Sequence, residues 1–569
     1  MRKRLLAFAS AMLMFASAGL AGCGSSASSG GSSGSTQAPA AQTGAAQAAQ
    51  AEAVQPGTQT EAQAAGEAKE TSAGPKTLLT ACAQDIGSLQ PWGHTYTLRF
   101  EIIDSIFEPL FWMNEDKELQ PILAKSYENL GDGRFQVTLF DYIYDANGNQ
   151  LKASDVVFSL DKFIEEGSNA RNISSLKEYK AVDDYTVEFQ FSNDSAGNFE
   201  TVVTLLLCCT EASFNASPDQ MVTTPVGTGR YELSEYVSGS YYTVKKRDSY
   251  WQTDDQYICL LNEAKVDEIT ARQIRDNSTI AVALENNEID FTENITETDR
   301  SNFMNDDGTP RDGYTMKVVE NPSLIRLYFN CSENSPCQDI NLRKAIATAI
   351  DNAAIAQNAQ GALGSVAYNN VNPIWLDADL TLNTREDGYY DYNEEKAKEY
   401  LAQSGYNGEP VRLLVFPNEN TTDSAVLIQA YCKKVGINVE LLTYEDALYK
   451  ELRGEETGTV YDLDLGGITS STAYTWKNFN ELDVNAYKSG VNHNFIYDET
   501  CQDLYDKAAS SATNSKEAAN DLIKYVTDQC YIYSLFYYNN AYFAHSGKVQ
   551  AIPVGPSQSF ALVTAFDIN

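Results

Sequence analysis

The sequence predicts an α/β protein with at least two lobes, and three observations carry this prediction. Strand-like segments alternate with helix-like segments along the chain, which favours sheets covered by helices. Residues 76–569 exceed the roughly 250–300 residues at which a single core stops growing. The 34 Tyr, 23 Phe and 5 Trp provide enough apolar surface for more than one core.

The alternation is clear between residues 130 and 170. Residues 135–140 alternate apolar and polar side chains, as a half-buried strand does. Asn147 and Gly148 follow, and this pair favours the positive φ angles of a tight turn. A helix is then predicted from residue 152 onward, with Ser154 as its N-cap.

The second half of the chain carries similar signals. Residues 343–354 combine good helix formers with apolar residues at helical spacing, so one helix is predicted there. Residues 393–403 open with Asn, carry Glu in the first turn and precede Gly405, as a capped helix does. Residues 411–416 and 439–442 are typical of short buried strands.

The first residues have the pattern of a bacterial export signal. Basic residues 2–4 precede an apolar run, and the small residues Ala21 and Gly22 come directly before Cys23. We interpret residues 1–22 as a lipoprotein signal peptide and Cys23 as a diacylglyceryl-bearing residue that holds the protein at the cell membrane. A plain secretory signal is the alternative, whereas a transmembrane anchor is disfavoured because polar residues dilute the run and follow it.

Residues 24–75 consist mainly of Ala, Gly, Ser, Thr, Gln and Glu, without an aromatic residue. Such a composition cannot bury enough apolar surface to offset the entropy of ordering. We therefore predict a lipidated cysteine and disordered tether over residues 23–75, with the globular part beginning at about residue 76.

The net charge excludes some classes of binding partner, and the number of cysteines limits how they can pair. The formal net charge is −37, so nucleic acid and anionic lipid are poor partners. Of the ten cysteines, Cys23 is assigned to the lipid, which leaves an odd number. Cys331 and Cys337 flank a short segment and could pair, although most cysteines are expected to be buried as small apolar residues.

No signature of a catalytic or metal site is present. The chain has no P-loop or HExxH motif, and residues 76–569 contain no GxSxG elbow, so an enzyme is disfavoured. It has no CxxC pair, and His94, His493 and His545 lie far apart in sequence, so a structural zinc site is not expected. We predict no cofactor.

Five stretches together resemble the family 5 solute-binding proteins, the extracytoplasmic receptors of peptide and nickel ABC importers. The resemblance spans roughly residues 78–560, and each stretch follows in the family's order. The stretches are FQVTLFDYIYDANGNQLKASDVVFSL at 135–160, VGTGRYEL at 226–233 with VKKRDSYW at 244–251, LRKAIATAID at 342–351, YNEEKAKEYL at 392–401 and KVGINVE at 434–440.

The resemblance implies a two-lobed clamshell of the periplasmic-binding-protein type II, with a subdomain inserted in the first lobe. Lobe I would comprise residues 76–320 and 526–569, with the insertion at about 112–225. Lobe II would comprise residues 321–525. Closure of such lobes traps a solute between them, and a permease recognises the closed state.

Ligand contacts are expected where aromatic walls and polar anchors meet in the cleft. By resemblance, the loop with Trp92 and His94 faces the ligand from lobe I. Lobe II would contribute the residues of two segments, Asn372, Trp375, Thr469, Ser470, Ser471 and Trp476. Similar peptide receptors bind the ligand's amine with an Asp near residue 471, where this chain has hydroxyl side chains, so the amine would be met elsewhere or the ligand would differ. Asp462 and Asp464 alternate with leucines, which suggests a strand whose acidic side faces away.

The sequence thus predicts a lipid-anchored, extracytoplasmic receptor that delivers an oligopeptide-like solute to the permease of an ABC importer. An oligosaccharide or a nickel chelate remains an alternative ligand. A surface sensor with the same fold, which signals rather than transports, is a further alternative.

Overall fold

The computed structural model describes residues 74–83, 87–92, 102–166, 170–367, 370–375, 377, 390–455, 457–469, 474–483, 494–510, 515–555 and 560–569. The predicted signal peptide, Cys23 and residues 24–73 of the tether lie outside the described residues, as do the candidate site residues His94, Ser470 and Ser471. No described helix has the length and apolar character needed to cross a bilayer.

One mixed sheet organises the described chain in the order β10-β11-β12-β1-β13-β19-β14-β18-β16-β17, with β15 paired to β19. Its strands are β1 (Thr77–Cys82), β10 (Tyr231–Val237), β11 (Tyr241–Lys246), β12 (Glu268–Gln273), β13 (Phe291–Thr292), β14 (Tyr314–Phe329), β15 (Ser365–Val366), β16 (Val411–Val415), β17 (Val439–Thr443), β18 (Leu463–Thr469) and β19 (Ile532–His545). We call the part with β1 and β10–β13 lobe I, and the part with β15–β18 lobe II.

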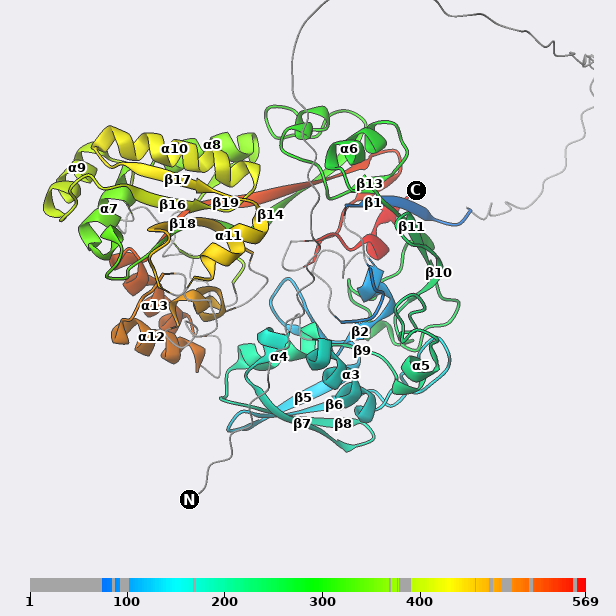
Figure 1. Cartoon of the computed structure of the whole chain (residues 1–569). Helices are drawn as coiled ribbons and strands as arrows, with labels where there is room; N and C mark the ends of the chain where they lie inside the picture. The colour runs from blue at the N-terminus through cyan, green and yellow to red at the C-terminus, as the bar shows by residue number, and fades with distance from the viewer. Residues whose placement is uncertain are drawn as a thin grey trace, which may run out of the picture. The chain divides into compact units, whose positions relative to one another are not determined.

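The long strands β14 and β19 belong to both lobes. They pair antiparallel from Tyr314 opposite His545 to Tyr328 opposite Ile532, and Figure 1 shows them as neighbouring strands that connect the two parts of the sheet. The register shifts between Val319 and Ser323, which marks an irregularity midway along the pair. The lobe limits at residues 320 and 526 and the insertion at 112–225 stay predictions.

The segment between β1 and β10 adds a separate sheet and several helices to lobe I. A four-stranded sheet has the order β5-β6-β8-β7, and β3 pairs with β4 as a hairpin. The strands are β2 (Glu108–Pro109), β3 (Phe111–Met113), β4 (Leu119–Pro121), β5 (Ala124–Gly131), β6 (Arg134–Leu139), β7 (Leu176–Asp183), β8 (Thr186–Phe191) and β9 (Leu207–Cys208), and the helices are α2 (Asp104–Ile106), α3 (Ala153–Glu166), α4 (Ala196–Leu205) and α5 (Glu211–Ala216).

Helices cover the sheet of lobe II, where α10 lies against β16 and β17 and α8 lies against β15 and β19 (Figure 1). Its helices are α7 (Ile340–Ala349), α8 (Asn352–Gln360), α9 (Glu394–Gln403), α10 (Glu419–Val435), α11 (Asp446–Arg453), α12 (Glu499–Ala509), α13 (Lys516–Asp528) and the 3-10 helix η9 (Thr475–Leu482). Helix α6 (Asn277–Glu285) and the strands β20 (Val549–Ala551) and β21 (Asp567–Ile568) complete the main elements. Separate buried apolar clusters fill the two lobes, which confirms a two-lobed α/β fold.

Two of the predicted helix boundaries are wrong for identifiable reasons. Helix α3 begins at Ala153, so Ser154 lies inside it, and the Asp155 carboxylate accepts the backbone N–H of Lys152 at 2.7 Å. The helix predicted over residues 343–354 is two helices, α7 and α8. The break occurs because Asp351 caps α8 by accepting the N–H of Ala354.

Other local predictions are confirmed. Strand β6 covers most of residues 135–140, and Gly148 has the positive φ of 80° that the Asn-Gly turn favours. Asn393 caps α9 through the N–H of Lys396 at 3.0 Å. Cys331 and Cys337, whose pairing the sequence left open, are both free thiols.

Candidate functional site

In lobe II, the predicted Trp375 packs in an aromatic and cationic cluster. Its side chain is fully buried, and its ring meets that of Phe479 edge to face at a centroid distance of 5.7 Å. The guanidinium of Arg326 lies 4.9 Å from the Phe479 ring centroid and 5.5 Å from that of Trp375. The cluster connects β14 to the segment of residues 370–375 and to η9.

Arg326 holds these segments together by hydrogen bonds. Its Nη1 donates to the carbonyl of Asn478 at 3.1 Å and forms an ion pair with Glu481 at 3.4 Å. Its Nη2 donates to the carbonyl of Asn370 at 3.3 Å. Burial raises the pKa of Glu481, and the Arg326 charge opposes this rise. The Arg326 side chain is fully buried, so its charge is compensated mainly inside lobe II.

Hydrogen bonds of Asn372 and Asp377 fix the loops around this cluster. The buried side chain of Asn372 accepts the N–H of Ile374 at 3.1 Å. The carboxylate of Asp377 accepts both the N–H and the hydroxyl of Thr475 at 2.7 Å. Asn372 therefore shapes the predicted ligand segment, and Asp377 positions the start of η9.

The two lobes meet directly beside this cluster. The Tyr474 hydroxyl donates to Glu200 Oε1 on α4 at 3.2 Å, and the Lys477 ammonium donates to Thr201 Oγ1 on the same helix. Lys117, at the turn between β3 and β4, donates its ammonium to the carbonyl of Trp375. Charged side chains from both lobes therefore take part in one interface.

Lys477 and Glu200 at this interface are partly shielded from water, and this burial shifts the pKa of both groups. Burial lowers the pKa of Lys477 to about 8, although the Glu200 carboxylate opposes the fall. Burial raises the pKa of Glu200, while the Tyr474 hydroxyl and the Lys477 charge lower it. The Oε2 atom of Glu200 is buried and has no hydrogen-bond partner among the described residues.

Shape as well as charge brings the lobes together at Tyr474. A Cβ atom on Gly197 of α4 would lie 2.4 Å from Cδ2 of the Tyr474 ring, so only glycine allows this approach. Tyr474 is 7% exposed and shares an apolar cluster with Met113 of β3. The ring of Tyr474 thus fits against the backbone of α4.

The other predicted site residues lie in different surroundings. Trp92 is buried in lobe I, where its Nε1 donates to the carbonyl of Leu207 at 3.2 Å and its ring packs on those of Phe158 and Phe214. Trp476 is partly buried and meets Tyr505 edge to face. Thr469 is the last residue of β18 and pairs with Ser323 at the irregularity of β14.

No pattern in the sequence indicates Glu200, Lys117, Tyr474 or Lys477 as site residues. The contacts between Glu200 and Tyr474 and between Lys477 and Thr201 join residues 274 and 276 positions apart. A local sequence pattern carries no signal for such pairs. Lys477 follows the predicted Trp476 directly, which is the one hint that the sequence offered.

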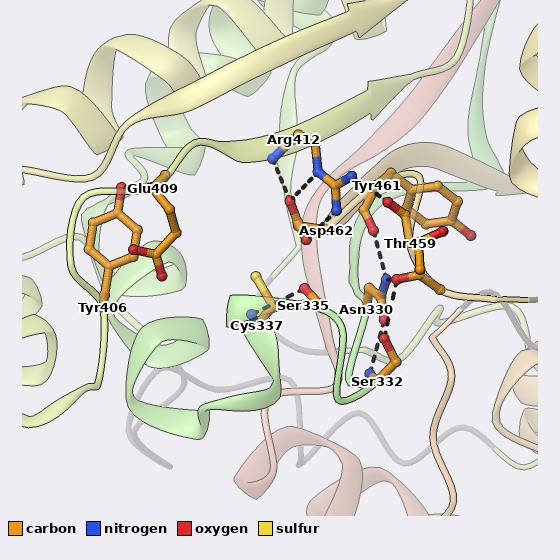
Figure 2. Close-up of polar contacts among 11 residues, drawn as sticks. Asn330, Ser332, Ser335, Cys337, Tyr406, Glu409, Arg412, Thr459, Tyr461 and Asp462 are labelled. Atoms are coloured by element: carbon orange, nitrogen blue, oxygen red, sulfur yellow. Dashed lines mark hydrogen bonds and ion pairs between the residues drawn. The ribbon is translucent and has the colours of Figure 1, made fainter.

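The acidic residues Asp462 and Asp464 are buried, and each forms an ion pair with an arginine of lobe II. Figure 2 shows Arg412 against Asp462, with the Nε–Oδ2 distance at 2.9 Å and the Nη2–Oδ1 distance at 3.0 Å. Arg453 pairs with Asp464 at 2.7 Å. Asn330 donates to the carbonyl of Tyr461 in the same network. These contacts hold the start of β18 in place, so they have a structural role.

A cavity of about 750 Å³ also opens in lobe II, near Ser332 at the edge of this network. Two of its charged groups, Arg343 and Asp498, already bind other groups of the protein. Arg343 donates to the carbonyls of Cys337 and Gln529 at 2.8 Å, and Asp498 accepts the hydroxyls of Tyr525 and Tyr531 at 2.7 Å. The interface between the lobes is the stronger candidate for the ligand site, because the carboxylate oxygen Oε2 of Glu200 there has no hydrogen-bond partner among the described residues. Within the described residues no cluster of potential metal ligands occurs.

Comparison with known proteins agrees with this fold. The model of the bacterial extracellular solute-binding proteins, family 5 (middle), matches residues 118–488. A protein of Brucella ovis that is named an ABC transporter peptide-binding protein is 24% identical over 385 residues, which are 64% of this chain and 68% of that protein.

Two solved structures show the same architecture. The ABC transporter substrate-binding protein CtaP of Listeria monocytogenes superposes with a TM-score of 0.71 at 21% identity, over 87% of this chain and 99% of that one. The oligopeptide-binding protein AppA of Bacillus subtilis, solved with a nonapeptide, superposes with a TM-score of 0.66 at 18% identity, over the same shares of the two chains.

Proposed function

Because the chain belongs to the bacterial extracellular solute-binding proteins, family 5, we propose that it is the receptor of an ABC importer and that peptide-like solutes are its cargo. Relatives that are named peptide-binding proteins support this cargo class. The observation that carries the proposal is the meeting of charged side chains from both lobes, Glu200 and Lys477 among them, at one partly desolvated interface.

The solute would bind between the lobes, next to this interface. The segments of residues 370–375 and 469–476 would supply the contacts from lobe II, with Asn372 and Trp375 shaping the first of them. The pair β14 and β19 would allow the lobes to move, since its register shifts midway along both strands. In this proposal a bound solute stabilises the arrangement in which the lobes touch, and the permease recognises that arrangement.

A thermal-shift panel tests the cargo class. The full chain in detergent is heated with free-amine peptides, N-acetylated peptides, oligosaccharides or a nickel–histidine complex. Selective binding raises the free energy of unfolding by about 2.7 kcal/mol at a hundredfold excess over Kd. We expect a rise with peptides. A rise with sugars or the nickel complex alone would contradict peptide cargo, and no rise with any solute would contradict the receptor function.

We also propose that Cys23 carries the lipid anchor, on the basis of the small residues that precede it and the polar residues that follow. The Cys23→Ser variant should be exported but recovered in the aqueous phase after detergent partition, whereas the unchanged chain should enter the detergent phase.

A second experiment distinguishes transport from sensing by measuring the uptake of a labelled peptide into cells with and without the gene. Equal uptake would favour a sensor.

A further inference from the structure

We infer that Glu200 binds a positively charged group of the ligand, such as the ammonium of a free-amine peptide. This inference rests on the proposed function, because it assigns a ligand contact to the interface between the lobes. The two carboxylate oxygens of Glu200 differ in their hydrogen bonding. Oε1 accepts the Tyr474 hydroxyl at 3.2 Å, whereas Oε2 is buried without a partner in the described part of the chain.

A buried carboxylate oxygen without a partner is costly, so such an oxygen in a binding protein suggests a missing donor. The cost is avoided if the carboxylate takes up a proton or if a donor from outside the chain reaches it. Burial raises the pKa of Glu200, in agreement with a carboxylate that is only partly compensated. A ligand ammonium supplies both a hydrogen bond and a charge, which a neutral donor does not.

The two lysines at this interface do not fill this role. Lys477 directs its ammonium to Thr201 Oγ1. Lys117 directs its ammonium to the carbonyl of Trp375. At this interface the two lysines therefore direct their ammonium groups to other oxygens and leave Oε2 of Glu200 without a hydrogen-bond donor among the described residues.

The position of Glu200 suits a contact that depends on closure. It lies on α4 of lobe I, and its other oxygen is held by a residue of lobe II. A ligand cation at Oε2 would therefore be bound by a carboxylate that Tyr474 orients only when the lobes meet. The formal net charge of −37 also attracts cations to the protein from solution. A positively charged ligand group would therefore favour the arrangement in which the lobes touch.

The test compares free and blocked amines on the same peptide. Glu200→Gln removes the charge but keeps a side-chain carbonyl that can accept the Tyr474 hydroxyl. Calorimetric titration of the full chain with a free-amine tripeptide should show binding about 10- to 100-fold weaker in the variant, as expected for one charge-assisted hydrogen bond. Binding of the N-acetylated tripeptide should stay within about twofold of the unchanged protein.

Glu165→Gln is the matched control, since Glu165 lies on α3 of the same lobe and pairs only at the surface with Lys162. It should leave both affinities unchanged. A second measurement needs no variant, because the unchanged protein should itself prefer the free-amine tripeptide by about tenfold or more.

Three results would overturn the inference. Equal weakening of both peptides in Glu200→Gln would mean that Glu200 serves only the contact between the lobes. Unchanged affinity for both would mean that water or Lys477 satisfies the carboxylate. Equal affinity of the unchanged protein for free and acetylated peptides would show that no anchor for the amine exists. If no peptide binds the unchanged protein at all, the proposed function itself fails.

Discussion

The Gly197→Ala variant tests whether ligand binding brings Tyr474 against α4. Its new Cβ would lie 2.4 Å from Cδ2 and 2.7 Å from Cε2 of the Tyr474 ring, closer than carbon atoms pack. The ring cannot turn aside freely because its hydroxyl is bonded to Glu200. Such overpacking costs about 1–3 kcal/mol. Since this cost arises only when the lobes meet, it should weaken ligand binding about 5- to 150-fold.

The same substitution should have the opposite effect on the ligand-free protein. Gly197 lies inside α4 without a positive φ, so alanine favours the helix by about 0.5–1 kcal/mol. A protein whose lobes are apart should therefore unfold at the same or a higher temperature, although it binds ligand less tightly. Calorimetric titration measures the affinity, and thermal unfolding measures the stability without ligand.

Two further variants complete this experiment. Gly547→Ala is the control, because no atom lies within 4 Å of its new Cβ. Adding Tyr474→Ser to Gly197→Ala removes the ring that causes the clash, so the two changes should be non-additive by about 1 kcal/mol or more. The reasoning is refuted if Gly197→Ala binds ligand as tightly as the unchanged protein does.

Two other predictions concern the charges near the interface. Arg326→Met should destabilise the protein by about 3–5 kcal/mol in urea, because it leaves the Glu481 carboxylate buried without its cation. Adding Glu481→Gln should recover part of this loss, and strict additivity would argue against the pair. The pKa of Lys477 falls from 10.5 to about 8 on folding, so the unfolded chain binds more protons between these pH values. Raising the pH from about 8 to about 10 should therefore stabilise the protein, and Lys477→Met should lack this gain; an identical pH profile in both would contradict the assignment.

The local signals in the sequence were sufficient for many elements of the fold. Helix α9 was predicted from its Asn393 cap, and strand β16 from a run of apolar residues, because these signals lie within the element itself. Ser154 failed as a cap because the neighbouring Asp155 satisfies the start of α3. Two adjacent residues of similar capping preference cannot be ranked without the packing that buries one of them.

The residues of the candidate site could not be predicted from local sequence patterns. The need of clefts for aromatic walls favours Trp92 and Trp375 as ligand contacts, and this role stays a prediction. In the structure Trp92 packs inside lobe I, and Trp375 is fully buried against Arg326. Glu200 and Lys477 are unremarkable in a chain with 78 acidic and 41 basic residues. Their environment arises from contacts between segments far apart in the chain, which a single sequence does not encode in a readable pattern.

The shared strand β19 has a consequence for the order in which the protein can assemble. It pairs with β13 in lobe I, and with β14 along both lobes. Neither half of the sheet can therefore be completed without residues 532–545. A chain cut before Ile532 would not keep one intact lobe and lose the other. It would leave β13 and β14 with unpaired edges, the kind of surface that promotes aggregation.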